Sequence, residues 1–215
     1  MSRTENINNF SLIEEIWHAI SHGFGLALSV AGLAILVSFA TIGGSSVAIT
    51  SSAIFGTTLI LMYGSSTLYH AITHKEAKEL FQKFDHASIC ILIAGSYTPI
   101  TLVSLAGPWG YSIASAIWAT AFFGIYMKFI YPNRFEKLSL FLYLIMGWSI
   151  IVAIGPLSES MESGGIYLLV AGGLSYTLGV FFYINDHKNF YHAIWHLFVL
   201  GGSIFHFFMT LFYII

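Results

Sequence analysis

The sequence predicts an all-α integral membrane protein whose seven transmembrane helices form one bundle. Hydrophobic residues make up 57% of the 215 residues and charged residues only 8%, and the mean hydropathy is +0.79. Long stretches contain no Lys, Arg, Asp or Glu, and about 20 apolar residues suffice for a helix to cross a bilayer. We expect helices because the apolar runs are continuous, whereas the strands of a membrane barrel alternate.

Turn-forming and charged residues separate the apolar runs and so set the limits of each expected span. These breaks fall at residues 43–46, 74–83, 107–110, 131–134, 156–165 and 185–188. The expected spans are therefore, in order, 23–42, 50–70, 86–105, 110–130, 138–156, 165–184 and 192–213. No linker is long enough to separate two domains, so residues 1–215 are expected to form a single membrane domain.

The polar segment 1–22 is expected to precede the first span. It lacks the apolar core and small-residue cleavage site of a removable signal peptide. Glu15, His18 and His22 form a polar stripe at spacings of three and four residues. Such a stripe is typical of an amphipathic helix that lies on the inner membrane surface.

The basic residues predict the orientation of the bundle. All eight Lys and Arg residues lie before the first span or in, or next to, every second connection: Arg3, Lys75, Lys78, Lys83, Lys128, Arg134, Lys137 and Lys188. Basic residues mark the cytoplasmic side of a membrane protein. We therefore expect a cytoplasmic N-terminus and a C-terminus outside.

Three histidines are expected to meet at the cytoplasmic ends of their spans. His192 and His196 begin the seventh span one helical turn apart, and His70 ends the second span at the same depth. Ionisable residues inside a membrane are costly and usually functional. Three histidine ligands with an open fourth position are the arrangement of catalytic zinc sites, although copper, nickel and iron also accept imidazole.

Asp85 and Ser66 are the candidate catalytic residues beside this site. Asp85 begins the third expected span, and Ser66 lies one turn before His70. Asp85 is suited to bind the metal, orient a water molecule or accept its proton. The alternatives are a helix N-terminal role for Asp85 and a hydrogen bond from Ser66 to its own helix.

Taken together, these motifs resemble the hemolysin III family, the bacterial branch of the progestin and adiponectin receptor superfamily. The matching elements span about residues 14–208: Glu15-x-x-His18-x-x-x-His22, Ser66-x-x-x-His70, Asp85 and His192-x-x-x-His196. The resemblance implies a seven-helix protein of the bacterial plasma membrane. It also implies a zinc ion held by His70, His192 and His196, with Asp85 and Ser66 near a zinc-bound water. His18 departs from the family motif, which usually has asparagine there.

The resemblance further implies hydrolysis of amide bonds in lipids and a role in membrane-lipid homeostasis. We therefore expect a zinc-dependent hydrolase with a membrane lipid as substrate or ligand. A membrane sensor or regulator with structural zinc and a cytolysin remain alternatives, although no span has the continuous polar stripe of a pore. The net charge of −2 and the lack of a basic tail give no reason to expect nucleic-acid binding. The sequence predicts neither the substrate nor the oligomeric state.

Overall fold

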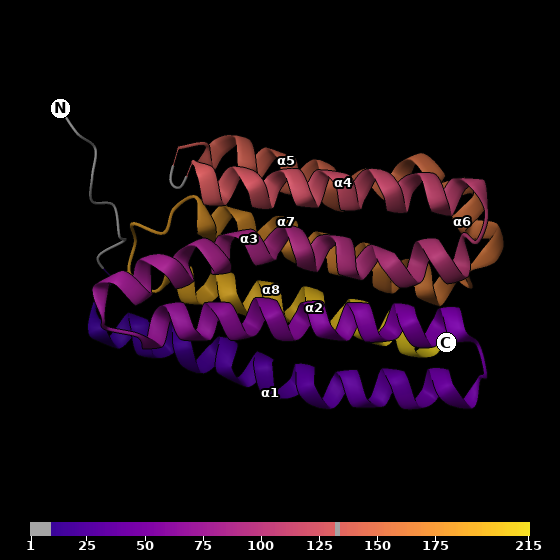
Figure 1. Cartoon of the computed structure of the whole chain (residues 1–215), viewed down its shortest axis with the longest axis horizontal. Helices are drawn as coiled ribbons and strands as arrows, with labels where there is room; N and C mark the ends of the chain where they lie inside the picture. The colour runs from indigo at the N-terminus through magenta and orange to yellow at the C-terminus, as the bar shows by residue number, and fades with distance from the viewer. Residues whose placement is uncertain (1–9, 132–133) are drawn as a thin grey trace.

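The computed structural model describes residues 10–131 and 134–215, which form a bundle of long helices (Figure 1). These residues contain no β-strand. The helices are α1 (Leu12–Ile42), α2 (Ser46–Ala71), α3 (Lys75–Pro99), α4 (Pro108–Ile130), α5 (Glu136–Trp148), α6 (Ile154–Ser160), α7 (Ser163–Tyr183) and α8 (Tyr191–Tyr213). A π-helical segment, Ile100–Ser104, extends α3, and a 3-10 segment, Ser149–Ala153, joins α5 to α6.

Seven segments are long and apolar enough to cross a membrane, which confirms the predicted fold class. The third runs through α3 and its π-helical extension, and the fifth runs from α5 through α6. Five of the seven begin within a few residues of the expected positions. The other two, α1 and α3, begin at Leu12 and Lys75, about three turns earlier than residues 23 and 86. Polar residues occupy those turns, so the apolar runs in the sequence do not show that the two helices begin there.

The first three turns of α1 differ from the expected interfacial helix. Residues 12–22 continue directly into the first span, and Ser11 caps the helix: its side chain and that of Glu14 bond each other's backbone N–H. His18 and His22 are buried, whereas Leu12 and Trp17 on the opposite face are exposed. The polar stripe therefore faces the bundle, and the apolar face points outward, as expected for a helix surrounded by lipid. Residues 1–9 lie outside the described part of the chain.

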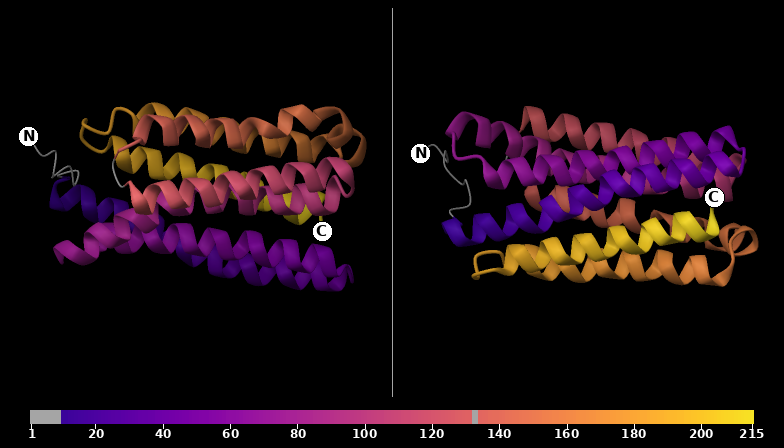
Figure 2. Two further views of the ribbon diagram at one scale, coloured as in Figure 1. Left: turned by 45° about the horizontal axis from the view of Figure 1, so that its top comes forward. Right: turned by 90° about the horizontal axis from the view of Figure 1, so that it is seen from below.

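Consecutive spans run in opposite directions, so α1 begins at one end of the bundle and α8 ends at the other (Figures 1 and 2). The α2–α3, α4–α5 and α7–α8 connections lie at the end where α1 begins. We call it the basic end, because every Lys and Arg that the structure describes lies in or near these connections: Lys75, Lys78, Lys83, Lys128, Arg134, Lys137 and Lys188. Arg3 lies outside the described residues. That this end faces the cytoplasm stays a prediction.

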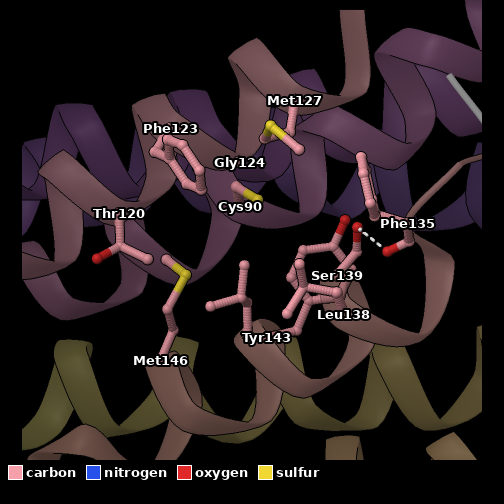
Figure 3. A pocket seen from close by; sticks show the side chains of 11 residues that line it. Cys90, Thr120, Phe123, Gly124, Met127, Phe135, Leu138, Ser139, Tyr143 and Met146 are labelled. Atoms are coloured by element: carbon pink, nitrogen blue, oxygen red, sulfur yellow. Dashed lines mark hydrogen bonds between the residues drawn. The ribbon is translucent and has the colours of Figure 1, made fainter. Parts of the chain in front are cut away.

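The core consists of two apolar clusters, one around α3–α8 and one around α1, α2, α3 and α8. A cavity of about 20 Å³ lies where α3, α4 and α5 meet (Figure 3). Cys90, Met127 and Met146 line it, and its volume is enough for about one water molecule. This cavity is a packing defect rather than a site, because its lining contains no histidine or carboxylate.

The close packing of α1 on α2 depends on Gly56. A Cβ atom at this position would lie 2.6–2.9 Å from Leu33, including its Cα atom. We predict that Gly56→Ala lowers the free energy of unfolding by about 1–3 kcal/mol, because the α1 backbone must move to relieve the overlap. Thermal unfolding of the purified protein in detergent would measure this effect.

Gly155→Ala is the matched control, because nothing lies within 4 Å of a Cβ atom built at Gly155. Alanine favours a helix over glycine by about 1 kcal/mol, so this variant should unfold at or above the wild-type temperature. Equal unfolding temperatures for the two variants would contradict the importance of Gly56 packing.

Candidate metal site

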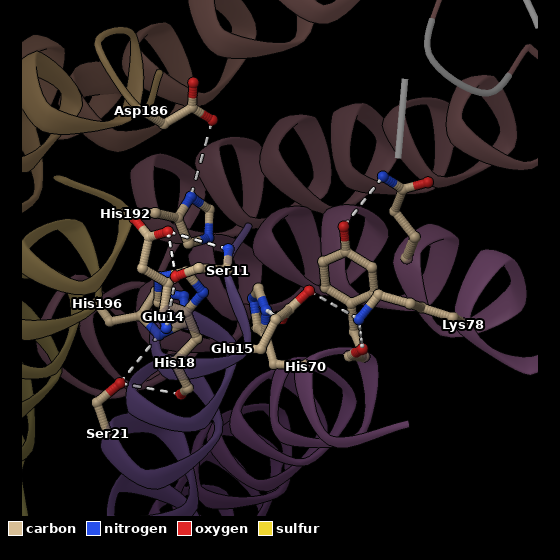
Figure 4. A network of polar contacts seen from close by, with 12 residues as sticks. Ser11, Glu14, Glu15, His18, Ser21, His70, Lys78, Asp186, His192 and His196 are labelled. Atoms are coloured by element: carbon tan, nitrogen blue, oxygen red, sulfur yellow. Dashed lines mark hydrogen bonds and ion pairs between the residues drawn. The ribbon is translucent and has the colours of Figure 1, made fainter. Parts of the chain in front are cut away.

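Five histidines converge inside the bundle near the basic end. Figure 4 shows His18, His70, His192 and His196, and His22 stacks on His196. His18 and His22 lie one turn apart on the inward face of α1, His70 lies in the last turn of α2, and His192 and His196 lie in the first two turns of α8. All five are buried. Three helices, the first two and the last of the bundle, therefore place their imidazoles in one small region.

His70, His192 and His196 form a group suited to a metal ion. Each offers a ring nitrogen, and the three nitrogens lie within 4.8 Å of one another. The structure thus brings together the three histidines that the sequence singled out. Metal binding itself stays a prediction.

Glu15 fixes the orientation of the His70 ring. Its Oε2 atom lies 2.6 Å from His70 Nδ1, and its Oε1 atom lies 3.0 Å from Lys78 Nζ. An ionised carboxylate only accepts hydrogen bonds, so Nδ1 carries the proton and donates it to Glu15. His70 Nε2 is then left with its lone pair, and it is buried with no hydrogen-bond partner among the described residues. Metal-binding histidines are oriented by carboxylates in this way.

The two α8 histidines have weaker supporting contacts. His196 Nδ1 lies 3.0 Å from the Ser21 hydroxyl. His192 Nδ1 lies 3.9 Å from Asp186 Oδ2 in the α7–α8 connection, which is too far for a hydrogen bond. Burial and the nearby Glu136 raise the pKa of the Asp186 carboxyl.

The donor set fits zinc. His70 Nε2 and His192 Nδ1 are buried and have no hydrogen bond to any described residue, and leaving buried polar atoms unpaired is costly. A bound cation would satisfy such nitrogens. Three neutral imidazoles suit zinc, whereas magnesium and calcium prefer oxygen ligands.

A second group, Glu15, His18 and His70, also has its ligand atoms within 4.8 Å of one another. The 2.6 Å between Glu15 and His70 is a hydrogen bond. Two donors on one tetrahedral zinc would stand about 3.3 Å apart, given zinc–nitrogen distances of about 2.0 Å. We therefore interpret Glu15 as a positioning residue for His70 and not as part of an independent metal site.

Asp85 lies outside both groups of potential ligands. It is not at the helix N-terminus, because α3 begins ten residues earlier and His74 is its N-cap residue. Ser66 is buried, and its hydroxyl makes no hydrogen bond to its own helix or to other described residues. Its side chain lies near that of Asp85. Both alternatives considered for these residues are therefore wrong, and their catalytic roles stay predictions.

Two further residues support the site and were not predicted from the sequence. Lys78 appeared to belong to a loop but lies in the first turn of α3, where it also donates to the Tyr69 carbonyl at 2.9 Å. Glu14 accepts a hydrogen bond of 2.8 Å from the Phe190 N–H at the start of α8. Glu14 thereby joins the beginnings of α1 and α8, which hold four of the five histidines.

Comparisons with known proteins identify relatives of this chain over most of its length. The family model described as "Haemolysin-III related" matches residues 10–207. The chain is 47% identical to "Hemolysin-3 homolog" of Bacillus subtilis (strain 168), over 95% of this chain and 96% of the relative. It is 46% identical to "Hemolysin-3" of Bacillus cereus, over 94% and 92%. It is 32% identical to the human "Monocyte to macrophage differentiation factor", over 72% and 66%.

Bacterial relatives and seven membrane-spanning helices together establish a multi-pass bacterial membrane protein. The family match covers α1 and most of α8, and therefore the helices that carry all five converging histidines. The chain belongs to the haemolysin III-related family.

Proposed function

We propose that this protein is a zinc-dependent hydrolase that cleaves amide or related bonds in membrane lipids. The observation that carries the proposal is the convergence of three buried histidine nitrogens within 4.8 Å, in a bundle that also encloses an apolar cavity. The first feature suits a catalytic metal, and the second suits a lipid chain.

The cavity supports a lipid as the substrate. It has a volume of about 140 Å³ and lies between α2, α3, α5, α7 and α8. Its wall includes Tyr183, whose ring lies 6.3 Å from the His192 ring, and extends as far as His206 in the second half of α8. Mostly apolar side chains such as Leu92 and Val199 line it. Apolar cavities with a few polar groups are typical ligand sites.

The chain supplies the groups that hydrolysis requires. When bound, zinc would polarise a carbonyl group and make a water molecule more acidic. Asp85 would accept a proton from the attacking water and pass it to the leaving amine, so that a C–O bond replaces the C–N bond. Ser66, which lies near Asp85, would hold the Asp85 carboxylate in position. Glu15 would keep His70 Nε2 directed at the metal.

A second candidate is a membrane sensor or regulator in which zinc is structural. One observation favours it: His18 is buried and in ring contact with all three proposed ligands. A zinc site with four protein ligands has no position for a reacting water.

The ligand assignment predicts the metal content. The purified protein should contain about one zinc per chain, and the double variant His192→Ala/His196→Ala should contain essentially none. Elemental analysis after purification in detergent would measure this. His206→Ala is the control, because His206 is another buried α8 histidine, but it lies ten residues beyond His196. Full zinc content in the double variant would show that the ligands are wrong.

The positioning role of Glu15 predicts a weaker effect. Glu15→Gln should lower zinc affinity about 10- to 100-fold, the range found for groups that orient metal ligands, because the amide no longer holds His70 as a carboxylate does. Competition with a zinc chelator would measure the affinity. Glu76→Gln is the control, since Glu76 is exposed and pairs with the exposed His74 rather than with a histidine of the cluster. Unchanged affinity in Glu15→Gln would refute the role.

The catalytic role of Asp85 predicts a loss of turnover without a loss of metal. Asp85→Asn should reduce hydrolysis of an N-acyl lipid at least about 100-fold, in line with a general acid–base residue, while zinc content and unfolding temperature stay near wild type. Release of fatty acid from a panel of lipid amides in vesicles would provide the rates. Wild-type protein with full zinc but no turnover would favour the structural candidate.

A further inference from the structure

Phe10 covers the histidine cluster at the basic end of the bundle. Its ring centroid lies 4.7 Å from that of His18, 4.9 Å from that of His192 and 6.2 Å from that of His70. These histidines belong to α1, α8 and α2. One side chain, two residues before α1 begins, therefore packs against all three helices that carry the cluster.

The position of Phe10 in the sequence would ordinarily give its ring a different partner. Ser11 is the N-cap residue of α1, and an apolar residue just before the N-cap often packs on an apolar residue at the fourth helical position. That position is Glu15, whose carboxylate bonds His70 and Lys78 instead. The Phe10 ring therefore has no apolar partner within its own helix end and packs on the imidazoles.

Phe10 separates these imidazoles from the end of the bundle. It is half-buried, whereas His18, within the first two turns of α1, is completely buried. The backbone beside Phe10 is held in place by the capping bonds between Ser11 and Glu14. It is also held by the bond that Glu14 accepts from the Phe190 N–H at the start of α8. The ring is thus a side-chain cover on a fixed backbone.

The imidazole nitrogens nearest this cover lack partners. Both ring nitrogens of His18 and Nδ1 of His192 are buried with no hydrogen bond to any described residue. Unpaired buried nitrogens are costly, so any water that reached them would be bound. The Phe10 ring offers water no hydrogen bond and occupies the side of the cluster that lies toward the end of the bundle.

We propose that Phe10 is a gate that controls how water and small water-soluble molecules, including metal ions, reach the histidine cluster from the basic end. Displacing this one ring opens the route. A metal ion would use it, whereas a lipid would come from the apolar cavity, whose wall includes Tyr183 beside His192. The inference goes beyond the proposed function and requires neither bound zinc nor hydrolysis.

Acylation of histidines by diethyl pyrocarbonate tests the gate in the full-length protein in nanodiscs, with peptide mass spectrometry giving the rate at each histidine. Phe10→Ala should raise the rate at His18 by at least about 10-fold, the factor that corresponds to losing contacts worth about 1.4 kcal/mol. His18 is not one of the three proposed ligands, so its rate reports access whether or not zinc is bound. The exposed His74 should react equally in all variants.

Phe190→Ala is the matched control, because it makes the same side-chain change at the same end of the bundle. Phe190 is 41% exposed, and its bond to Glu14 comes from the backbone N–H, which alanine keeps. This variant should label His18 at the wild-type rate. Phe10→Trp, which keeps an aromatic ring over the cluster, should also leave His18 protected.

A wild-type rate at His18 in Phe10→Ala would overturn the gate. Rapid labelling of the buried His206 would instead show that this variant has unfolded, and the smaller change Phe10→Leu then decides. Faster labelling of His18 in Phe10→Leu with His206 protected supports the gate, and a wild-type rate overturns it. Purified protein without zinc would overturn the zinc site but not this inference.

Discussion

The structure depends on the need to satisfy charged and polar side chains buried where α1, α2, α3 and α8 meet. Glu15 bonds His70 at 2.6 Å and Lys78 at 3.0 Å, so one carboxylate joins α1 to both α2 and α3. Glu14, the preceding residue, joins α1 to α8 through the Phe190 N–H. A buried carboxylate without partners would cost several kcal/mol. Pairing of the Glu14 and Glu15 carboxylates therefore holds these helices in their observed arrangement. The same arrangement brings the histidines together.

The first turns of α1 show why a membrane helix can resemble a surface helix in sequence. Trp17 and Ile20 are exposed, whereas His18 and His22 are buried, so α1 is polar inside and apolar outside. A helix that lies on the membrane surface has the same periodicity, but its apolar face is buried in the membrane and its polar face is exposed to water. Periodicity identifies the two faces but not which of them is buried. Only the neighbouring helices, with their own polar groups, decide that α1 turns its histidines inward.

The parts of the site that the sequence predicted follow from position along a helix. The spacing of His192 and His196 places both rings on one side of α8, and the ends of the spans place His70 at the same depth. The parts that it did not predict depend on how each helix is rotated toward its neighbours. The Glu15–His70 and Lys78–Glu15 contacts join different helices, and no local spacing encodes them. Asp85 illustrates the same limit: it begins the third expected span beside His70 in depth, yet it lies outside the groups of potential ligands.

The surroundings of the three proposed ligands bear on both candidate functions. The Phe10 ring lies 4.7 Å from that of His18 and 4.9 Å from that of His192, so this side of the cluster is covered by an apolar ring. Tyr183, a residue of the cavity wall, lies on another side of His192. A lipid carbonyl that reached the proposed metal would therefore approach from the cavity. A metal that binds only the folded bundle would stabilise it, whether or not a substrate ever reaches that metal. The proposed zinc site and the proposed hydrolytic activity are thus separable properties.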